Sequence, residues 1–564
     1  MIIFQERNIY KMAKYRYHPM AMHLHTIYQP GSSMSGHMYN ASKLGMEYIR
    51  FTDHDVHTGP KKLPFHSFDF SRGVLKYSDS ADPNDTANQC GWNPVGDPEI
   101  SFNGGSMILS ASGNSKEAVG VSFTASGKRH NTALVADVTV TVGISCEFKG
   151  DARVILDIQL SEHPPEHTYS HLRYVIGKVK EPHIPHVAEI PLEISHDNLY
   201  TLRLSEDVQR DGISQIVGGL DNAFSTLSIL IEPNGGSAVC NINRFELHWV
   251  YKFDDVIARQ RVIADEVGKK YGIKPFVTTE ISGAGQHKNC FSTKVPVIDY
   301  SEWNYDITQM EAIAHVKAHG GIFAYNHPFE KYKRQDLTDE EKESILLKKA
   351  MSFIASKVYG ASMMEVMFVD GRGKFGLQQF LQLWDMISMG GVFITGYGDS
   401  DSHHSDRGWF SGQNAASWIA ADENIPFPIP EDIFIESMKA GRVYAGDPIF
   451  LRDPISFTCG NTPMGGIIPI ADRDYSSRTL KFTVLNPGED WSVRIIIDGS
   501  VFHEQKIGKT DTFTFTFEVQ PNMTVSFARA ELYNGSGRCI MLTNPIYLVR
   551  TAEYSGELPK ERLY

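Results

Sequence analysis

The sequence predicts an α/β domain that is interrupted by an all-β insert and followed by a small C-terminal β-sandwich domain. Three observations support this division. Residues 1–62 and 252–447 alternate short apolar stretches with amphipathic helical ones, which is typical of α/β domains. Residues 63–251 contain β-branched and aromatic segments separated by Gly, Asn, Asp and Pro, which is typical of a β-sandwich. Residues 448–564 show the same pattern of β-branched and aromatic segments over a shorter length.

The α/β parts show their elements in order. In the first part, an apolar stretch ends near His25, a helix is expected around residues 39–46, and residues 47–52 form a second strand. The second part opens with an amphipathic helix over residues 254–271. Further helices are expected at residues 310–319, 339–359, 377–389 and 431–440, and further strands at residues 274–279, 321–325, 362–369 and 391–395.

The two β parts are predicted from alternation and from β-branched or aromatic content. The strands expected in the insert cover residues 133–142, 154–160, 199–204, 226–231 and 244–251. Those expected in the C-terminal domain cover residues 480–485, 492–497, 512–518 and 524–531. Aromatic residues such as Trp92 are expected in the sandwich core rather than on a sugar-binding face.

Composition excludes several classes of partner. The chain of 564 residues has 54 Lys and Arg against 67 Asp and Glu, a formal net charge of −13, and no basic stripe, which argues against nucleic acid as a partner. No stretch approaches the roughly 18 uninterrupted apolar residues of a membrane span. The six cysteines show no C-x-x-C spacing, which favours a reducing, cytoplasmic location. Composition says nothing about the oligomeric state.

Histidine carries the strongest functional signal. Several of the 22 histidines stand in clusters beside carboxylates. Five predicted strands end in or beside a potential metal ligand: His23 and His25, His54, Glu280, His327, and Asp401 and His403. In a parallel βα barrel the carboxyl ends of the strands converge on one face, so these side chains are expected to meet.

The ligand types indicate which cations would bind. His-x-His on a strand places both imidazoles on one face, because strand side chains alternate, and Asp401-Ser402-His403 repeats this spacing. A mixed set of nitrogen and oxygen ligands favours Zn, Mn or Fe over Ca or Mg. Two or three such divalent cations could share these ligands, with Glu280 as the natural bridge.

The same residues resemble a known family. Residues 21–26 (AMHLHT), residues 51–55 (FTDHD), Glu280, residues 326–328 (NHP) and residues 401–403 (DSH) look like the ordered motifs of the PHP (polymerase and histidinol phosphatase) family of metal-dependent hydrolases. The match covers residues 18–60 and 250–450. Within the family, the stretches that begin at Glu280 and Gly441 resemble the carbaryl-hydrolase-like (CehA/McbA) branch, although Gln286 separates Gly285 from His287 here.

The resemblance implies a fold and a ligand set. It implies a distorted (β/α)7 PHP-type barrel with a di- or trinuclear metal site, whose ligands would be His23, His25, His54, Glu280, His287, His327, Asp401 and His403. One departure concerns the third metal. The family often has Asp in a Ser-Asp-Gly element where this chain has Gln29-Pro30-Gly31, so either the third metal is absent or another side chain such as His37 supplies the ligand.

The expected reaction is hydrolysis of a small, anionic ester, with a phosphoester favoured. Metal-bound hydroxide would attack the phosphorus or carbonyl carbon, since a cation can lower the pKa of its bound water to about 7. Asp53 would orient His54 or the water. Arg407, His404 and Lys288 are candidates to hold the substrate anion, and phosphate favours Arg for its fork geometry.

Other functions and assignments stay open. The same site could hydrolyse a carboxylic ester, carbamate or amide. Alternatively, the barrel could be degenerate and bind a glycan or a protein partner without catalysis; the departure at Pro30 motivates this second alternative. An amidohydrolase-type barrel also begins with His-x-His but relies on a bridging lysine where this chain has Glu280. Within the site, Asp399 and His404 could replace Asp401 and His403 by a register slip, and Glu365 is expected as a polar residue at the barrel rim.

Overall fold

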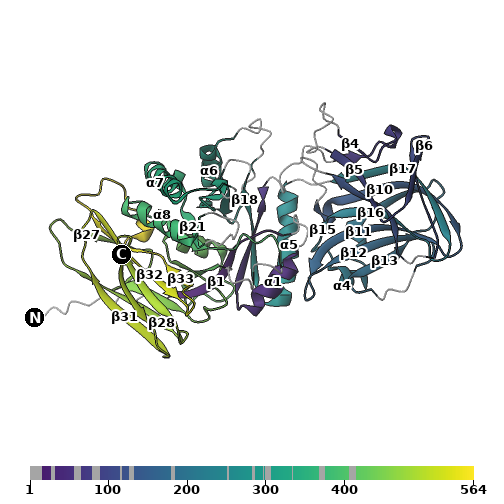
Figure 1. The fold of residues 1–564 in the computed structure, drawn as a ribbon. Coiled ribbons are helices and arrows are strands. Elements are labelled where there is room, and N and C mark those ends of the chain that lie inside the picture. Colours follow the sequence, from purple (N-terminus) through teal and green to yellow (C-terminus); the bar gives the residue numbers. More distant parts are fainter. Residues whose placement is uncertain are drawn as a thin grey trace, which may run out of the picture.

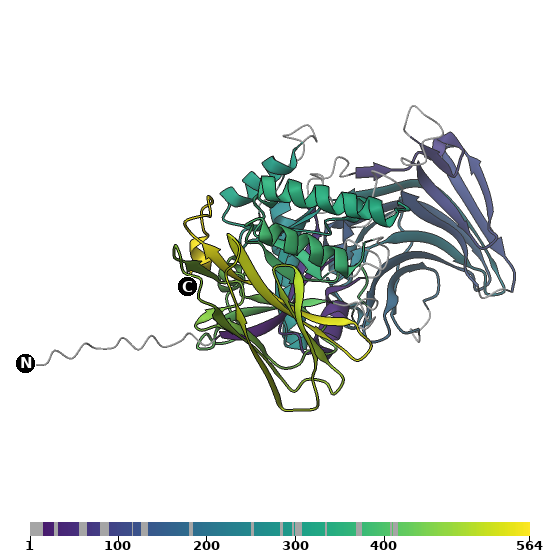
Figure 2. The ribbon, with the colours of Figure 1, turned by 60° about the vertical axis from the view of Figure 1, so that its left-hand side comes forward.

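Strands predominate in the protein. The computed structural model describes residues 15–26, 32–55, 65–78, 89–114, 117–125, 133–179, 184–249, 253–282, 286–295, 298, 307–332, 335–367, 375–405, 409 and 415–564. Figure 1 shows three parts in a row, with the insert on one side, the C-terminal strands on the other, and the longer helices in the central part. The view of Figure 2 keeps the insert and the C-terminal strands on opposite sides of that central part.

The central part is built on one mixed sheet. Its strands, in spatial order, are β22 (Thr395–Gly398), β21 (Met363–Met367), β20 (Ile322–Tyr325), β19 (Lys288–Phe291), β18 (Lys274–Ile281), β2 (Tyr48–His54), β1 (Tyr15–Leu24), β23 (Ala416–Asp422) and β24 (Val443–Gly446). Strands β1, β2 and β18 run parallel to one another, as do β20, β21 and β22. Strand β19 lies antiparallel between these two groups.

The predicted (β/α)7 barrel is therefore wrong as the fold class. Strands β19, β23 and β24 are antiparallel to their neighbours, and beyond β24 the same sheet continues into the C-terminal strands. No strand ladder joins β22 to β23 in the described chain. Instead, the Gly398 amide donates to Ser417 Oγ at 3.0 Å, and Ser417 Oγ donates to the Gly398 carbonyl at 2.9 Å. The molecule is a strand-rich, multi-sheet protein with helices in its central part.

Two short strands explain this error. Strand β19 has only four residues, KNCF, which show no alternation in the sequence, yet all four are buried between β18 and β20. Strand β23, with the sequence ASWIAAD, pairs antiparallel with β1. Among the described residues, neither is preceded by a helix that would form a crossover connection, so the alternation of helix and strand does not reveal them.

The helices follow the predicted pattern closely. Those of the central part are α1 (Met34–Lys43), α5 (Phe253–Tyr271), α6 (Gln309–Ala318), α7 (Asp339–Ser356), α8 (Leu377–Met389) and α9 (Glu431–Lys439), and two short helices, α3 (Leu204–Asp207) and α4 (Ile213–Val217), lie in the insert. Helices α6 and α7 begin with capping boxes, in which Thr308 pairs with Glu311 and Thr338 with Glu341. Helix α1 begins earlier than expected because Ser33 caps it by accepting from the Gly36 amide. Among the described residues, no helix combines the length and apolar character that a membrane crossing requires.

The insert is a β-sandwich of two main sheets. One contains β14 (Leu199–Arg203), β10 (Val138–Lys149), β17 (Ser237–Trp249), β7 (Ser106–Ser112) and β6 (Glu99–Asn103). The other contains β13 (Val187–Pro191), β12 (Thr168–Ile176), β11 (Arg153–His163), β16 (Thr226–Glu232), β8 (Val119–Ala125), β5 (Gln89–Val95) and β4 (Lys76–Ser78). Trp92 is fully buried in the apolar core, so its predicted core position is confirmed.

The C-terminal part is also formed by two sheets. Strands β33 (Cys539–Thr543), β32 (Val525–Tyr533), β29 (Ser492–Ile497) and β30 (Ser500–Lys506) extend the central sheet, and β34 (Ile546–Arg550) joins β32 to β27 (Ile467–Ile470). The second sheet contains β26 (Thr462–Pro463), β25 (Ile455–Cys459), β28 (Arg478–Leu485) and β31 (Thr512–Val519). Asn544 ties this part to the site-bearing strands, because its side-chain amide donates to the Gly396 and Val443 carbonyls at 2.7 and 2.8 Å.

Candidate metal centre

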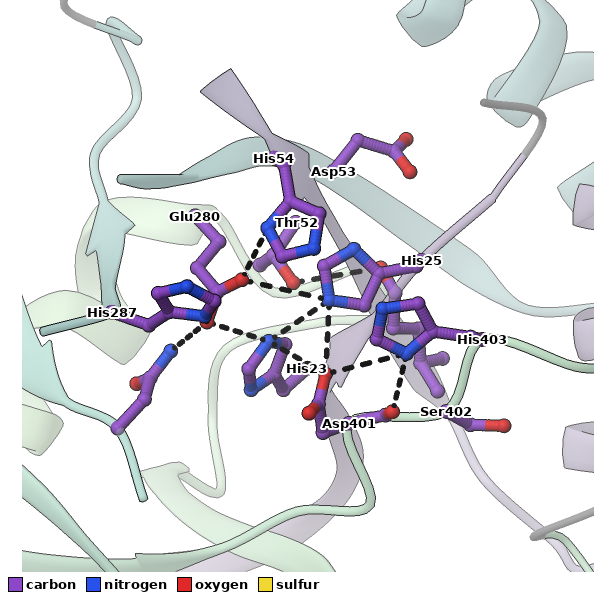
Figure 3. A network of polar contacts seen from close by, with 12 residues as sticks. His23, His25, Thr52, Asp53, His54, Glu280, His287, Asp401, Ser402 and His403 are labelled. Carbon is purple, nitrogen blue, oxygen red and sulfur yellow. Dashed lines mark hydrogen bonds and ion pairs between the residues drawn. The ribbon is translucent and has the colours of Figure 1, made fainter. Parts of the chain in front are cut away.

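The carboxyl ends of the parallel strands bring the predicted ligands together. His23 and His25 lie at the end of β1, His54 at the end of β2 and Glu280 near the end of β18. Of the remaining four, His327 follows β20, Asp401 and His403 follow β22, and His287 precedes β19. Figure 3 shows seven of these side chains pointing toward a shared centre: His23, His25, His54, Glu280, His287, Asp401 and His403.

Glu280 lies at the middle of the cluster and is fully buried. Its Oε2 is 2.7 Å from His54 Nδ1 and 3.7 Å from His25 Nε2. Its Oε1 is 3.3 Å from both His23 Nε2 and His287 Nδ1. This central position is what the predicted bridging role requires.

Asp401 completes the side of the cluster that contains His25. Its Oδ1 lies 3.0 Å from His25 Nε2, 3.3 Å from His23 Nε2 and 3.6 Å from His403 Nδ1. The His25 and His403 rings stack with centroids 4.0 Å apart. Asp401 has a positive φ of 46°, an uncommon conformation for a non-glycine residue that turns its carboxylate toward the two imidazoles.

A second group of carboxylates lies on the far side of the His23 ring. His23 Nδ1 is 3.6 Å from Glu365 Oε1 and 3.4 Å from Asp399 Oδ2. His327 Nδ1 is 2.9 Å from Glu365 Oε2, and the His327 amide donates to the same oxygen. Glu365, expected as a polar residue at the barrel rim, is thus a fully buried member of the cluster. Asp399, an alternative to Asp401 in the sequence, is also buried, and both aspartates belong to the cluster.

A third group lies on the open side. Glu330 Oε2 is 3.8 Å from both His287 Nδ1 and His327 Nε2. The side chains of His287 and Glu330 are 27 % and 24 % exposed, whereas those of His23, Glu280 and Glu365 are fully buried. The sequence alone did not indicate Glu330, although its spacing three residues after His327 matches a one-turn ligand pair.

Neighbouring polar groups hold the cluster in place. Asn326 Nδ2 donates to Glu280 Oε1 at 2.7 Å, while Asn326 Oδ1 accepts from Tyr397 Oη at 2.9 Å. Gln286, which departs from the family pattern, donates to the carbonyls of Asn326 and His327 at 3.1 and 3.0 Å. Gln286 therefore fixes the start of β19 and, with it, the position of His287.

The electrostatics favour positive charge at the centre. Burial alone lowers the pKa of His23, but Asp401 and Glu280 raise it well above the usual value. Burial alone raises the pKa of Glu280, yet His23 and other nearby imidazoles hold it well below its usual range. Burial and the Glu365 charge together raise the pKa of Asp399. In the absence of a cation, Asp401 and Glu280 therefore favour the protonated form of His23.

The residues present fit divalent cations. Two ligand atoms about 2.1 Å from one ion stand roughly 3–4 Å apart, the range of most contacts in this cluster. Within the described chain, five groups of three such residues have all ligand atoms within 4.8 Å of one another. Both Asp399 oxygens and Glu365 Oε1 are buried without a hydrogen bond of good geometry among the described residues, which is costly unless a cation or proton lies nearby.

The other predicted site residues that the structure describes lie outside this cluster. The Asp53 carboxylate points away from it (Figure 3) and accepts from the Thr26 amide and hydroxyl at 2.7 and 2.5 Å and from Gln260 at 3.0 Å. Asp53 therefore holds the backbone after His25 rather than the His54 ring. The Lys288 ammonium is buried and donates to the Gln286 carbonyl. His404 is exposed, and Arg407 lies outside the described residues.

His37 is not available as a substitute ligand. The Trp409 indole N–H donates to His37 Nδ1 at 3.0 Å, so Nε2 carries the ring proton and donates to the His25 carbonyl at 2.9 Å. Burial lowers the pKa of His37 to about 3, which keeps the ring neutral. His37 therefore supports the backbone of His25. Pro30, the other residue of the predicted departure, lies outside the described residues.

Comparison with known proteins identifies no family. The chain matches no protein-family model, and no curated protein resembles it significantly. Among solved structures it is similar to a family 12 xyloglucanase from Bacillus licheniformis, with 10 % identity, a TM-score of 0.21, and coverage of 33 % of this chain and 100 % of that one. Endoglucanase 3 of family GH12 from Trichoderma harzianum gives 12 % identity, a TM-score of 0.19, and coverage of 34 % and 100 %.

A third structure, an endo-β-1,4-mannanase from Thermotoga petrophila, gives 10 % identity, a TM-score of 0.14, and coverage of 52 % of this chain and 61 % of that one. At TM-scores this low, none of the three similarities carries an argument about the fold or activity of this chain.

Proposed function

We propose that this chain is a metal-dependent hydrolase of small anionic esters, and that its preferred substrates are phosphoesters. The observation that supports this most strongly is that six histidines meet Glu280, Glu365 and Asp401 in one cluster, most of them at or just after the carboxyl ends of parallel strands. The motif order that resembles the PHP family supports the same proposal. The proposal concerns the chemistry of these strand ends and does not need a closed barrel.

The cluster has separate places for more than one cation. Bound Zn, Mn or Fe would supply a water activated for attack near neutral pH and would withdraw charge from the ester oxygen. Glu280 lies between the His54 and His23 groups and is placed to belong to both. Burial and repulsion by His403 lower the pKa of His25, so this imidazole is neutral, the form that ligates a metal.

The chain's own residues define the direction of approach for a substrate. His23 and Glu280 form the closed floor of the site, since both side chains are fully buried. His54, His287 and His403 are 14 %, 27 % and 28 % exposed and surround the open side. Among the described residues, that side is therefore the one open to an ester, while Asn326 keeps Glu280 in position beneath it.

Metal content and thermal stability test the metal part of the proposal. Protein purified without added metal is expected to contain at least about one equivalent of transition metal, and added Mn or Zn should raise its Tm. His25→Gln should reduce both effects. The matched control is His18→Gln, because His18 is also buried on β1 but pairs with Glu47 at 2.6 Å, away from the cluster.

A substrate screen tests the reaction. Metal-loaded protein should hydrolyse phosphomonoesters or phosphodiesters faster than aryl carboxylic esters. Activity on the carboxylic esters alone would contradict the phosphoesterase proposal. It would indicate a carboxylic ester hydrolase that uses the same residues. Protein that neither contains metal nor gains Tm with it would instead favour a non-catalytic binding protein.

A further inference from the structure

A large cavity lies beside the cluster. It has a volume of about 830 Å³ and shares His287 and Glu330 with the open side of the candidate metal centre. Helix α7 and the residues around β20 supply most of its other walls. Pockets of this size enclose whole small-molecule ligands, so the cavity has far more room than one phosphate group needs.

The charge of the cavity is predominantly positive. Three lysines line it, Lys331, Lys348 and Lys349, and Glu330 is the one carboxylate among its described lining residues. Glu330 lies at the edge shared with the cluster, 3.8 Å from His287 Nδ1. None of the three lysines forms an ion pair with a carboxylate in the described part of the chain. Their charge is therefore available to an anion that enters the cavity.

Lys349 is the most constrained of these lysines. Its Nζ lies 5.5 Å from the centroid of the Tyr325 ring and 5.1 Å from that of Phe353. Burial, followed by the repulsion of Lys331, lowers the pKa of Lys349 to about 8. An ammonium held among aromatic rings with no carboxylate gains more from a bound anion than a fully hydrated one does.

The remaining walls suit an organic body rather than an inorganic ion. Tyr325, Tyr332 and Phe353 supply aromatic surface, and Ile345 adds an aliphatic side chain. Tyr325 immediately precedes the Asn326-His327 pair of the cluster, so the aromatic wall and the metal ligands belong to one strand end. A molecule that reaches from the cluster into the cavity passes along this wall.

We infer that the cavity binds the part of the substrate away from the scissile ester, and that this part carries a second anionic group held by Lys349. The inference rests on the proposed function, because it takes the scissile ester to lie at the metal cluster. It narrows the substrate class to metabolite-sized esters with at least two anionic groups. The second group can be a carboxylate or another phosphate, since both accept hydrogen bonds from an ammonium.

A matched pair of substrates tests this inference. Phenyl phosphate and 4-carboxyphenyl phosphate share the scissile bond and differ only in the second anion. Lys349→Gln should raise the KM for 4-carboxyphenyl phosphate about tenfold, because one charge-assisted hydrogen bond is lost. The KM for phenyl phosphate should change less than about twofold. Lys349→Arg should retain the preference. Lys342→Gln is the control, because Lys342 lies on the same helix but pairs with Asp339.

A binding measurement separates this inference from the proposed function. Calorimetry with 4-phosphonobenzoate and phenylphosphonate, which are not hydrolysed, reports binding alone. A Lys349-dependent preference for 4-phosphonobenzoate without hydrolysis of any ester would support the cavity assignment and contradict the proposed function. Hydrolysis with equal effects of Lys349→Gln on both substrates would overturn the cavity assignment and leave the proposed function standing.

Discussion

Two histidine-rich regions of this protein differ in how their polar atoms are satisfied. Where the insert meets α1, His163 Nδ1 lies 2.9 Å from Ser35 Oγ, and His163 Nε2 lies 3.0 Å from Asn222 Oδ1. Asp221 accepts there from the amides of Met34 and Ser35, both at 2.8 Å. Each buried polar group in that region thus has an ordinary hydrogen-bond partner.

The strand-end cluster is the opposite case. Imidazoles and carboxylates face one another there, and several buried oxygens, including both of Asp399, lack a good hydrogen bond within the described chain. The comparison shows that histidines and carboxylates gathered in space do not by themselves indicate a metal site. The distinguishing feature is a shared centre toward which ligand atoms point without enough donors between them.

The largest expected effect comes from removing the central carboxylate of the cluster. Glu280→Gln should lower hydrolytic activity at least about 100-fold and abolish the metal-induced rise in Tm, because two groups of ligands lose a shared oxygen. Elemental analysis and an assay at saturating Mn or Zn measure this. Metal content and activity equal to those of the unaltered protein would show that the cluster is a hydrogen-bonded network like the one around His163.

A smaller effect is expected from the residue that orients Glu280. Asn326→Leu removes the 2.7 Å hydrogen bond to Glu280 Oε1 but leaves every proposed ligand in place, so metal affinity should fall about 10- to 100-fold. Titration with Zn in the presence of a competing chelator measures the affinity. High metal concentration should restore part of the activity, which a merely unfolded variant would not show.

A substitution where the insert meets α1 should change the stability of the protein and leave its metal content unchanged. Asp221→Ala leaves two amides at the start of α1 without acceptors and should lower the free energy of unfolding by about 1–3 kcal/mol. Chemical denaturation followed by fluorescence measures this. Metal content should not change, and a loss of metal in this variant would mean that the insert shapes the cluster directly.

The smallest effect concerns pH and the cavity lysine. Lys349 is charged below its pKa of about 8 and loses its charge as the pH rises through that value. The preference for 4-carboxyphenyl phosphate over phenyl phosphate, expressed as a ratio of kcat/KM values, should therefore fall about fivefold between roughly pH 7 and 9.

Taking the ratio of kcat/KM values cancels the effect of titration within the cluster, because that effect is common to both substrates. The other titratable groups that line the cavity are Lys331, Lys348, Glu330, His287 and the tyrosines Tyr325, Tyr332 and Tyr359. Burial raises the pKa of Tyr325, so this phenol does not titrate in the same interval. Lys349→Arg should make the ratio independent of pH, because the guanidinium stays charged, and a ratio that still falls would assign the effect to another group.

The sequence predicted which side chains meet better than it predicted the fold. The convergence of side chains at the ends of apolar strands, such as His54 and His327, could be predicted because parallel strands end on one face. Glu365 was harder to assign because it lies inside the five-residue strand β21, where its neighbours Met364 and Val366 suggest only a buried strand. Its role depends on the position of His327, which no local pattern reveals.

The fold class failed for a similar reason. Helix α8 matches its expected bounds because amphipathic periodicity is a local property. The pairing of β23 with β1 and the insertion of β19 between two parallel groups are non-local and leave no periodic signal in seven or four residues. The domain boundaries drawn from the sequence stay predictions, although β3 (Phe65–Ser67) through β17 form the insert and α5 begins after it.

Locating bound metal by anomalous X-ray scattering would test the central claim most directly. In crystals grown with Zn or Mn, at least one anomalous peak is expected within ligand distance of Glu280, with His23, His25 or His54 among its other ligands. A second peak between His327 and Glu365 would establish a site with more than one metal. Full occupancy of the protein by metal elsewhere, or no peak at Glu280 at saturating metal, would contradict the account.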